Sequence, residues 1–494
     1  MERKCNVLFA ASEAVPFIKT GGLGDVAGSL PPALQAEGCE VRVMLPKFRS
    51  IPEEFRRRME HVADFRLQLA WRDLYCGIEK LEYRGVTWYF IDNEYYFGRD
   101  RAYGYFDDGE RMAFFSRAIV ESLRYLPDFQ CDVLHCHDWH TALAPVYLRE
   151  YYRGQPWFDR IRTVLTVHNL KFKGQMTDFV LEDILGFSRY SPTAGCLRMD
   201  DWSISYLKGG LLYSDVLTTV SPTYAEEIRT PFYGEQLDGI FRQREGVLYG
   251  ILNGIDTEFY DPRRKDVLAA GFSAEKPGGK AVCKSALQAE LGLPVSPETP
   301  LIAMVGRLTE QKGLDLLQYG LEELMKNPVQ FAILGTGDSW WEEMLKGCAE
   351  AWPARMSVQI GFDEAMAVRM YAGADLLLMP SRFEPCGLAQ MLAMRYGTLP
   401  VVRETGGLKD SVRPFERFGD EGNGFSFPDY DGREMTETVL RAAWVYRDES
   451  AAFRKMRKNA MTQDFSWNRA AGQYADLYRS LHPEISAWQT GEKP

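Results

Sequence analysis

The chain alternates short apolar runs with stretches of helical periodicity. In the first half, each run is followed by a glycine or polar turn and then by a helical period. The predicted strands are Asn6–Ala10, Val41–Leu45, Thr87–Ile91, Asp132–His135, Thr163–Val167 and Asp215–Val220. Several are apolar nearly throughout, which is typical of parallel strands covered on both faces. The segment Ala63–Tyr83 departs from this pattern and is predicted to form an inserted hairpin.

The alternation stops near Ile251–Asp256 and resumes at residue 301. The stretch between is rich in Gly, Pro and Lys, with one predicted helix near Lys280–Leu291. After it, the predicted strands are Leu301–Val305, Gln330–Leu334, Met356–Ile360, Leu376–Met379 and Thr398–Val402. The economical interpretation is an α/β protein with two doubly wound, Rossmann-like domains.

The predicted domains follow from these breaks. The first covers residues 1–255, and the second covers 256–466, beginning with a linker at 256–300. Residues 467–494 follow, and their helix, Trp467–Leu481, has no strand after it. We expect this helix to cross back and pack against the first domain.

Composition narrows the functional classes. A length of 494 residues suits two domains of ordinary size. The formal charge of −11 argues against a nucleic-acid partner. No run is apolar enough to span a bilayer and no signal peptide is visible. The nine cysteines are scattered without a C-x-x-C pair, so neither a zinc cluster nor a disulfide framework is indicated, and a cytoplasmic location fits best.

The loops after predicted parallel strands are where ligands collect in open α/β sheets. The first such loop is Lys19–Val26, which contains Gly21 and Gly22 before a helix. Paired glycines let backbone N–H groups approach a phosphate, the helix start favours anions, and Lys19 adds charge. A glycine turn with a solvated lysine is the alternative at this point.

Three loops of the second half have similar chemistry. Glu404–Leu408 repeats the Gly-Gly-Leu turn, and Gly335–Asp338 follows another strand. In the third loop, Arg307 and Lys312 lie five positions apart across a strand-to-helix turn. Both can therefore reach one diphosphate and stabilise it as a leaving group.

The segment Ser381–Leu388 adds a carboxylate. Pro385 suits the first position of a helix, which predicts that Glu384 is the N-cap residue. Glutamate is not a favoured N-cap, so this carboxylate is a candidate for binding sugar hydroxyls or facing developing positive charge. The alternative is a simple interaction with the helix dipole.

Four of the six histidines lie in His135–His140 and in Val167–Asn169. The first segment resembles a metal-hydrolase cluster but fails on spacing. Two alternatives remain open: Asp138 caps the next helix with the histidines packed around it, or Asp138 and His168 bind sugar. The single D-x-D candidate for a metal, Asp429–Asp431, is explained by a turn and an N-cap. We expect no metal and no cofactor.

Taken together, these segments resemble the bacterial glycogen synthase and plant starch synthase family. The resemblance runs from the first strand to about Tyr478. Besides the loops above, its markers are His137–His140, Thr166–Asn169, Ser221–Ala225 and Asn253–Asp256. Any one marker is weak, but their order and separations together are specific.

The resemblance implies a GT-B fold, with two Rossmann-like domains facing each other across a deep cleft. It also implies transfer of glucose from ADP-glucose to the non-reducing end of an α-1,4-glucan with retention of configuration, without nucleic-acid or membrane partners.

On matching positions, the family implies roles for individual residues. Arg307 and Lys312 would hold the diphosphate. Glu384 would hold the glucose, with His168 beside the anomeric centre and Asp138 near sugar and acceptor. The implied substrate-binding residues are Lys19, Gly21, Gly22, Asp25, Asn253, Gly306, Gly335, Cys386, Gly387, Leu388, Thr405, Gly406 and Gly407.

Other functions stay open at this stage. The enzyme could use UDP-glucose, because no residue spacing reveals adenine recognition. A glucan phosphorylase would need a pyridoxal phosphate lysine, and no matching segment is apparent. A glucan-binding protein without catalysis would be expected to have lost part of the basic and acidic set, which this chain keeps.

Overall fold

A computed structural model describes residues 4–484 of the chain. The chain divides into two compact units. The first comprises the chain up to Gly254 together with the segment that starts at Trp467, and the second is Ile255–Ser466. No helix among residues 4–484 has the length and hydropathy needed to cross a membrane.

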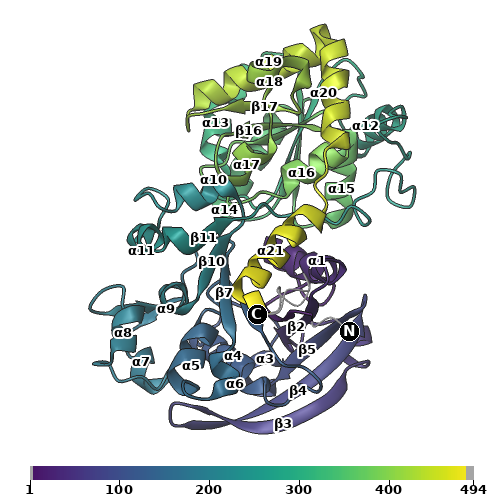
Figure 1. Ribbon diagram of the computed structural model, residues 1–494. Coiled ribbons are helices and arrows are strands. Elements are labelled where there is room, and N and C mark those ends of the chain that lie inside the picture. Colours follow the sequence, from purple (N-terminus) through teal and green to yellow (C-terminus); the bar gives the residue numbers. More distant parts are fainter. Residues whose placement is uncertain (1–3, 485–494) are drawn as a thin grey trace. The chain divides into compact units, whose positions relative to one another are not determined.

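The first unit contains a nine-stranded sheet in the order β11-β10-β7-β6-β1-β2-β5-β4-β3 (Figure 1). Its strands are β1 (Asn6–Ala10), β2 (Glu40–Pro46), β3 (Glu60–Leu69), β4 (Arg72–Tyr83), β5 (Val86–Asp92), β6 (Val133–His137), β7 (Arg162–Val167), β10 (Val216–Thr219) and β11 (Leu248–Gly250). All neighbours pair in parallel except β3 with β4 and β4 with β5, which are antiparallel. The predicted inserted hairpin is therefore confirmed.

Helices surround this sheet. They are α1 (Gly22–Ala36), α2 (Glu53–Arg56), α3 (Glu94–Phe97), α4 (Asp108–Ser122), α5 (Leu143–Tyr151), α6 (Pro156–Asp159), α7 (Val180–Asp183), α8 (Pro192–Leu197), α9 (Tyr206–Tyr213), α10 (Pro222–Glu227), α11 (Asp238–Gln243) and the 3-10 turn η1 (Glu245–Val247). A small antiparallel pair, β8 (Gln175–Thr177) with β9 (Ser203–Ser205), lies between α6 and α9 in the sequence.

The last helix, α21 (Trp467–Leu481), packs against α1 in the same unit. Its buried residues recur at helical spacing: Trp467, Ala470, Ala471, Tyr474, Ala475 and Tyr478. The Tyr478 hydroxyl lies 2.7 Å from Nδ1 of His135 on β6. Both the apolar stripe and this hydrogen bond therefore fix the end of the described chain to the core of the first unit.

The second unit is built on a six-stranded parallel sheet in the order β14-β13-β12-β15-β16-β17. The strands are β12 (Leu301–Val305), β13 (Gln330–Gly335), β14 (Met356–Ile360), β15 (Leu376–Met379), β16 (Leu399–Arg403) and β17 (Phe425–Phe427). Every residue of β13 and β15 is buried, as the uninterrupted apolar runs predicted.

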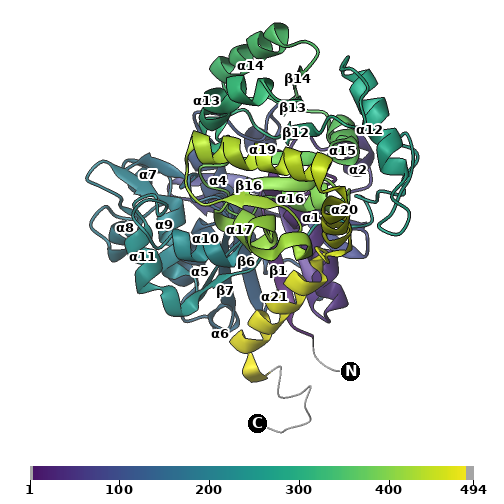
Figure 2. The ribbon, with the colours of Figure 1, turned by 90° about the horizontal axis from the view of Figure 1, so that it is seen from above.

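The helices of the second unit are α12 (Gly279–Glu290), α13 (Leu314–Met325), α14 (Ser339–Ala351), α15 (Glu364–Gly373), α16 (Ala389–Arg395), α17 (Gly406–Ser411), α18 (Phe415–Phe418), α19 (Gly432–Asp448) and α20 (Ser450–Thr462), with 3-10 turns η2 (Glu310–Lys312) and η3 (Gly419–Glu421) (Figure 2). Helix α13 packs against α19, which contacts β16 and β17, while α15 contacts β12 and β13.

The segment predicted as a linker is partly built into the second unit. Lys280 on α12 is buried, and its Nζ donates hydrogen bonds to the carbonyls of Ala372 and Tyr396 and to the Thr398 hydroxyl. Lys284 forms a buried ion pair with Asp375 at 2.7 Å. Lysines that look solvated in the sequence thus fasten α12 to the parallel sheet.

Candidate functional site

Each sheet has a point where the chain reverses its direction of winding, and ligands collect there in doubly wound folds. In the first unit this point lies between β1 and β6, because β2 follows on one side of β1 and β7 follows on the far side of β6. The loops after β1 and β6 contain Lys19 and Asp138, and the loop after β7 contains His168.

The loop after β1 leads into α1, with Gly21 as N-cap residue in an extended conformation. Gly21 and Gly22 are exposed, so the first N–H groups of the helix are accessible to an anion. The Lys19 ammonium lies 2.7 Å from the Asp25 carboxylate. The predicted residues Lys19, Gly21, Gly22 and Asp25 are therefore brought together at one helix start.

A buried carboxylate that the sequence interpretation missed braces this loop. Glu13 is 3% exposed and accepts hydrogen bonds from the Thr20 backbone N–H at 2.5 Å and from the Thr20 hydroxyl at 2.6 Å. Burial raises the pKa of Glu13, although the bonds from Thr20 oppose the shift. Glu13 stands three positions after the strand β1, so its place in this loop is visible in the sequence, but its burial is not.

Asp138 fixes the loop after the neighbouring strand. The backbone of Asp138 is left-handed, with a φ of 56°. The Asp138 carboxylate accepts a hydrogen bond from the His168 backbone N–H at 2.7 Å. The alternative in which Asp138 caps the next helix is wrong, because α5 begins at Leu143 without a side-chain cap. The carboxylate instead ties the loop after β6 to the loop after β7.

The His168 ring is oriented by a second histidine. Its Nε2 lies 2.9 Å from Nδ1 of His137, and burial lowers the pKa of both rings, that of His168 to about 3. Nε2 of His137 is buried without a hydrogen-bond partner among the described residues. Orphaned buried N–H groups are rare, so the geometry favours a proton on Nδ1 of His137. His168 then carries its own proton on Nδ1 and can donate it to a ligand.

Asp138 also gives a prediction about stability. Burial raises the pKa of its carboxyl to about 7, above the unfolded value of about 3.9. The contribution of protonated Asp138 to the free energy of unfolding is therefore largest below pH 4 and is lost as the pH rises through 7. We expect Asp138→Asn to raise the free energy of unfolding at pH 8 by on the order of 2 kcal/mol, with little effect near pH 4.

Urea unfolding at pH 4.5 and pH 8 checks this expectation. Asp476→Asn is a suitable control, because the Asp476 side chain is 80% exposed. If the free energies of unfolding of wild type and Asp138→Asn differed by the same amount at both pH values, the raised pKa of Asp138 would be contradicted.

In the second unit the winding reverses between β12 and β15. The loops after these two strands and after their neighbours β13 and β16 carry most of the predicted donor-binding residues. Parallel strands place all four loops at one edge of the sheet.

Two predicted residues from different loops pair directly. Nζ of Lys312, in η2, lies 2.6 Å from Oε2 of Glu384. The Ser381 hydroxyl donates to the same oxygen at 2.9 Å. Glu384 is only 7% exposed, so the ammonium and the hydroxyl compensate for the burial of its charge. A cation and a carboxylate thus stand side by side at the switch point.

Glu384 is not an N-cap residue, in contrast to the prediction. Helix α16 begins at Ala389, with Leu388 as the N-cap residue, so Pro385 lies in the loop before it. Cys386 is buried, and Gly387 has a left-handed φ of 69°. The loop therefore turns once more before the helix starts, and the carboxylate is held by Lys312 and Ser381 rather than by a helix terminus.

Arg307 is exposed in the loop that leads from β12 to Lys312. It follows Gly306, whose φ is 152°, and a Cβ added to Gly306 would come within 3.9 Å of Cε of Lys312. The Lys312 stem therefore lies next to the Gly306–Arg307 turn. Gly335, the last residue of β13, has no room for a side chain, since a Cβ would lie 1.9 Å from the Gly306 carbonyl oxygen.

The second Gly-Gly-Leu turn differs from the first in its surroundings. Thr405, Gly406 and Gly407 are buried, and the Gly407 N–H is bonded to the carbonyls of Glu384 and Pro385 at 3.2 Å. These glycines allow the loop after β16 to pack against the loop that carries Glu384. Assistance to a diphosphate by this turn stays a prediction.

Gly406 therefore provides a test of loop packing. Its φ is +44°, and a Cβ would lie 2.1 Å from the Glu384 carbonyl oxygen. We expect Gly406→Ala to lower the free energy of unfolding by about 2–3 kcal/mol, measured in urea. Gly347→Ala, in α14 with no heavy atom within 4 Å of an added Cβ, should instead stabilise by about 0.5–1 kcal/mol. Equal effects would refute the packing argument.

Asn253 and Asp431, which the sequence also singled out, lie outside the loops at the two switch points. Asn253 follows β11, the edge strand of the first sheet. Three strands, β10, β7 and β6, lie between β11 and β1, so Asn253 is not next to the switch point. Its Oδ1 is buried and has no hydrogen-bond partner among the described residues. Asp431 caps α19 by accepting hydrogen bonds from the N–H groups of Arg433 and Glu434, as the sequence indicated. No group of three or more His, Cys, Asp or Glu among residues 4–484 is arranged to hold a metal ion.

Comparison with known proteins relates this geometry to a family. Residues 6–243 match the family described as the starch synthase catalytic domain, and residues 292–462 match the glycosyl transferases group 1. The chain is 46% identical over 476 residues to a glycogen synthase from Desulfitobacterium hafniense, covering 96% of this chain and 99% of that protein. A glycogen synthase from Geobacillus thermodenitrificans is 49% identical over 96% of this chain and 97% of its own length.

Solved structures agree with this result. The catalytic domain of starch synthase IV from Arabidopsis thaliana, bound to ADP and acarbose, superposes with a TM-score of 0.89 at 31% identity, covering 98% of this chain and all of that one. A sucrose-phosphate synthase from Thermosynechococcus elongatus, at 17% identity over 97% of this chain and all of that one, has a TM-score of 0.61 and shares the fold. The predicted GT-B fold is confirmed, and the chain belongs to the glycogen synthase family of glycosyltransferases.

Proposed function

We propose that this enzyme transfers glucose from ADP-glucose to the non-reducing end of an α-1,4-glucan with retention of configuration. The bond between the sugar's anomeric carbon and the diphosphate oxygen breaks, and a bond to the acceptor's 4-hydroxyl oxygen forms. The acceptor proton goes to the departing diphosphate, which leaves as ADP. The relatives' names support the glucan product, and the ADP bound to the starch synthase supports the nucleotide.

One observation carries the proposal: the Lys312–Glu384 pair lies at the switch point of the second unit, next to the turn that carries the exposed Arg307. A sugar diphosphate needs cations for its phosphates and an acceptor for its hydroxyls within a short distance. Arg307 and Lys312 supply the cations, and Glu384 supplies the acceptor. Held beforehand in this geometry, they stabilise the charge that develops as the diphosphate leaves.

The proposal also gives roles to residues at the switch point of the first unit. The exposed N–H groups at the start of α1, with Lys19, bind the donor's diphosphate. His168 donates from Nδ1 to a hydroxyl of the transferred glucose, and Asp138 holds the His168 loop in place. His137 is a positioning residue, because it acts through the His168 ring.

A donor competition assay tests the proposal. The enzyme is incubated with glycogen and equal amounts of ADP-glucose and UDP-glucose that carry different labels, and incorporation into polymer is followed. We expect incorporation mainly from ADP-glucose, with ADP released. Preferential use of UDP-glucose would overturn the nucleotide assignment. Formation of glucose 1-phosphate from glycogen and phosphate without a donor would instead favour a phosphorylase.

A further inference from the structure

The Asp-Tyr-Asp segment before α19 contributes a side chain that reaches the loop of Glu384. Asp431 ends this segment and caps α19, so the start of the helix fixes the place of the half-buried Tyr430 directly before it. The Tyr430 side chain contacts residues from the loop after β15, the last position of β16 and the first turn of α13. It therefore lies where the elements that carry Lys312 and Glu384 meet.

Two arginine side chains lie over the Tyr430 ring. The Cζ atom of Arg382 is 5.0 Å from the ring centroid, and that of Arg403 is 5.6 Å from it. An aromatic face attracts a guanidinium group, and the attraction is larger where the cation is withdrawn from water. Arg403 is only 9% exposed. The ring therefore helps to compensate for the burial of the Arg403 charge.

Arg403 holds the backbone of the loop that carries Glu384. Its Nη1 donates to the Arg382 carbonyl at 2.6 Å and to the Ser381 carbonyl at 3.4 Å. Glu384 follows two residues after Arg382, so the same bonds restrain its backbone. Because Arg403 is the last residue of β16, they fasten the loop to the end of a strand in the parallel sheet.

The turn that carries Lys312 is fastened to the same cluster. The Arg382 guanidinium pairs with Glu310, two positions before Lys312, at 2.5 Å. On the other side of Lys312, the Tyr430 hydroxyl donates to the Asp315 carboxylate in the first turn of α13. These two contacts fix the backbone before and after Lys312, whereas the contact between the Tyr430 ring and the guanidinium groups acts on the opposite loop.

We propose that Tyr430 is a positioning residue, which keeps the Glu384 carboxylate in the geometry that glucose transfer requires. The inference rests on the proposed function of Glu384. With the ring in place, Arg403 stays shielded from water and its bonds to the loop carbonyls are strong. Without the ring, water would reach Arg403 and compete for those bonds, so the loop and its carboxylate would shift. A misplacement of about 1 Å can lower a rate about 100-fold.

Variants of Tyr430 test the proposal. Tyr430→Ala should lower kcat about tenfold and change the KM for ADP-glucose less than about twofold, because the cations that bind the donor remain. Tyr430→Phe should keep kcat within about twofold of wild type, since it retains the ring and loses only the bond to Asp315. Dividing rates by the number of ADP-binding sites, measured by calorimetry, removes any unfolded protein. An unchanged kcat in Tyr430→Ala, or an equal loss in both variants, would contradict a positioning role for the ring.

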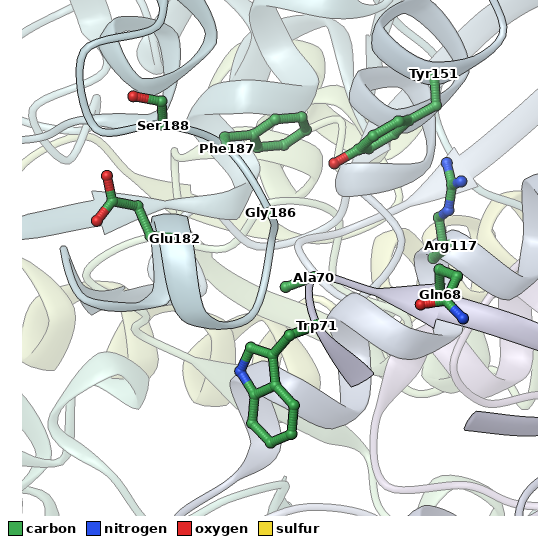
Figure 3. Close-up of a pocket in the computed structure, with 9 residues that line it drawn as sticks. All are labelled: Gln68, Ala70, Trp71, Arg117, Tyr151, Glu182, Gly186, Phe187 and Ser188. Carbon is green, nitrogen blue, oxygen red and sulfur yellow. The ribbon is translucent and has the colours of Figure 1, made fainter. Parts of the chain in front are cut away.

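Tyr151 is a matched control in the first unit. It lines a pocket of about 340 Å³, where the Cζ atom of Arg117 lies 4.2 Å from the centroid of its ring (Figure 3). Its hydroxyl donates to the Leu185 carbonyl at 3.2 Å. Tyr151→Ala thus removes a similar ring beside a similar cation, and its kcat with saturating maltoheptaose should equal that of wild type. A loss equal to that of Tyr430→Ala would mean that any such tyrosine affects turnover through the fold, which would overturn the proposal.

A double-mutant cycle identifies the side chain through which Tyr430 acts. In the Glu384→Gln background, Tyr430→Ala should lower kcat less than about twofold further, because the carboxylate that it positions is already absent. A further loss of about tenfold would show that the two residues act independently, and the positioning role would be wrong. A wild type that does not turn over ADP-glucose, or a Glu384→Gln variant with the kcat of wild type, would instead refute the proposed function, so the two failures are distinguishable.

Discussion

Replacing Arg307 with alanine should lower kcat/KM for the nucleotide-sugar donor by about 10²- to 10³-fold and leave the fold intact. Arg307 is exposed at the end of β12, so the loss of its side chain creates no cavity. The guanidinium is proposed to bind the diphosphate as negative charge develops on it, and such contacts are worth more in the transition state than in the bound substrate. Initial rates at varied donor concentration check this expectation.

Lys312→Ala should lower kcat/KM for the donor by a similar factor, but we also expect it to affect stability. It removes the 2.6 Å ion pair with Glu384, so some stability is lost as well. Arg433→Ala is the matched control, because Arg433 lies on α19 and its side chain is 78% exposed. Near-normal turnover in both Arg307→Ala and Lys312→Ala would refute the assignment of the diphosphate site.

The second large effect is expected for Glu384→Gln. This change keeps the size of the side chain but removes the charge that Lys312 and Ser381 hold in place. We expect kcat to fall about 100-fold while the affinity for the donor changes only a few-fold, since a carboxylate that faces developing positive charge acts mainly in the transition state. Steady-state rates, with donor binding measured by calorimetry, separate the two quantities.

Ser381→Ala is the comparison for this variant. It removes one hydrogen bond to Glu384 and leaves the ion pair, so a loss of only a few-fold in kcat is expected. If Glu384→Gln had the same kcat as wild type, a transition-state role for the carboxylate would be excluded. If it lost only donor affinity, Glu384 would be a ground-state binding residue.

The strand pattern in the sequence predicted most of both sheets. Runs such as Asn6–Ala10 and Leu301–Val305 coincide with observed strands, because a strand buried on both faces must be apolar along its whole length. Strands of three residues, such as β11 and β17, were not predicted. Three residues are too few to establish a periodicity, and pairing with a neighbouring strand decides that they are extended.

The candidate site was predictable as a set of loops, because every parallel strand directs its carboxyl end to the same edge of the sheet. The environment of each side chain was not predictable in this way. The sequence places Glu384 at a helix terminus, but the structure extends the loop to Leu388 and pairs the carboxylate with Lys312, 72 positions earlier in the chain. Likewise, nothing local indicates that Glu13 is buried against Thr20.

The two Gly-Gly-Leu turns show what the sequence by itself can predict and what it cannot. It determined that each turn follows a strand and begins a helix, since the apolar run and the glycines are local features. Only the tertiary structure decided that Gly21 and Gly22 are exposed, whereas Gly406 and Gly407 are packed beneath the loop that carries Glu384. The physical reason is that secondary structure follows local periodicity, while burial and charge pairing depend on which distant loops meet at the edge of a sheet.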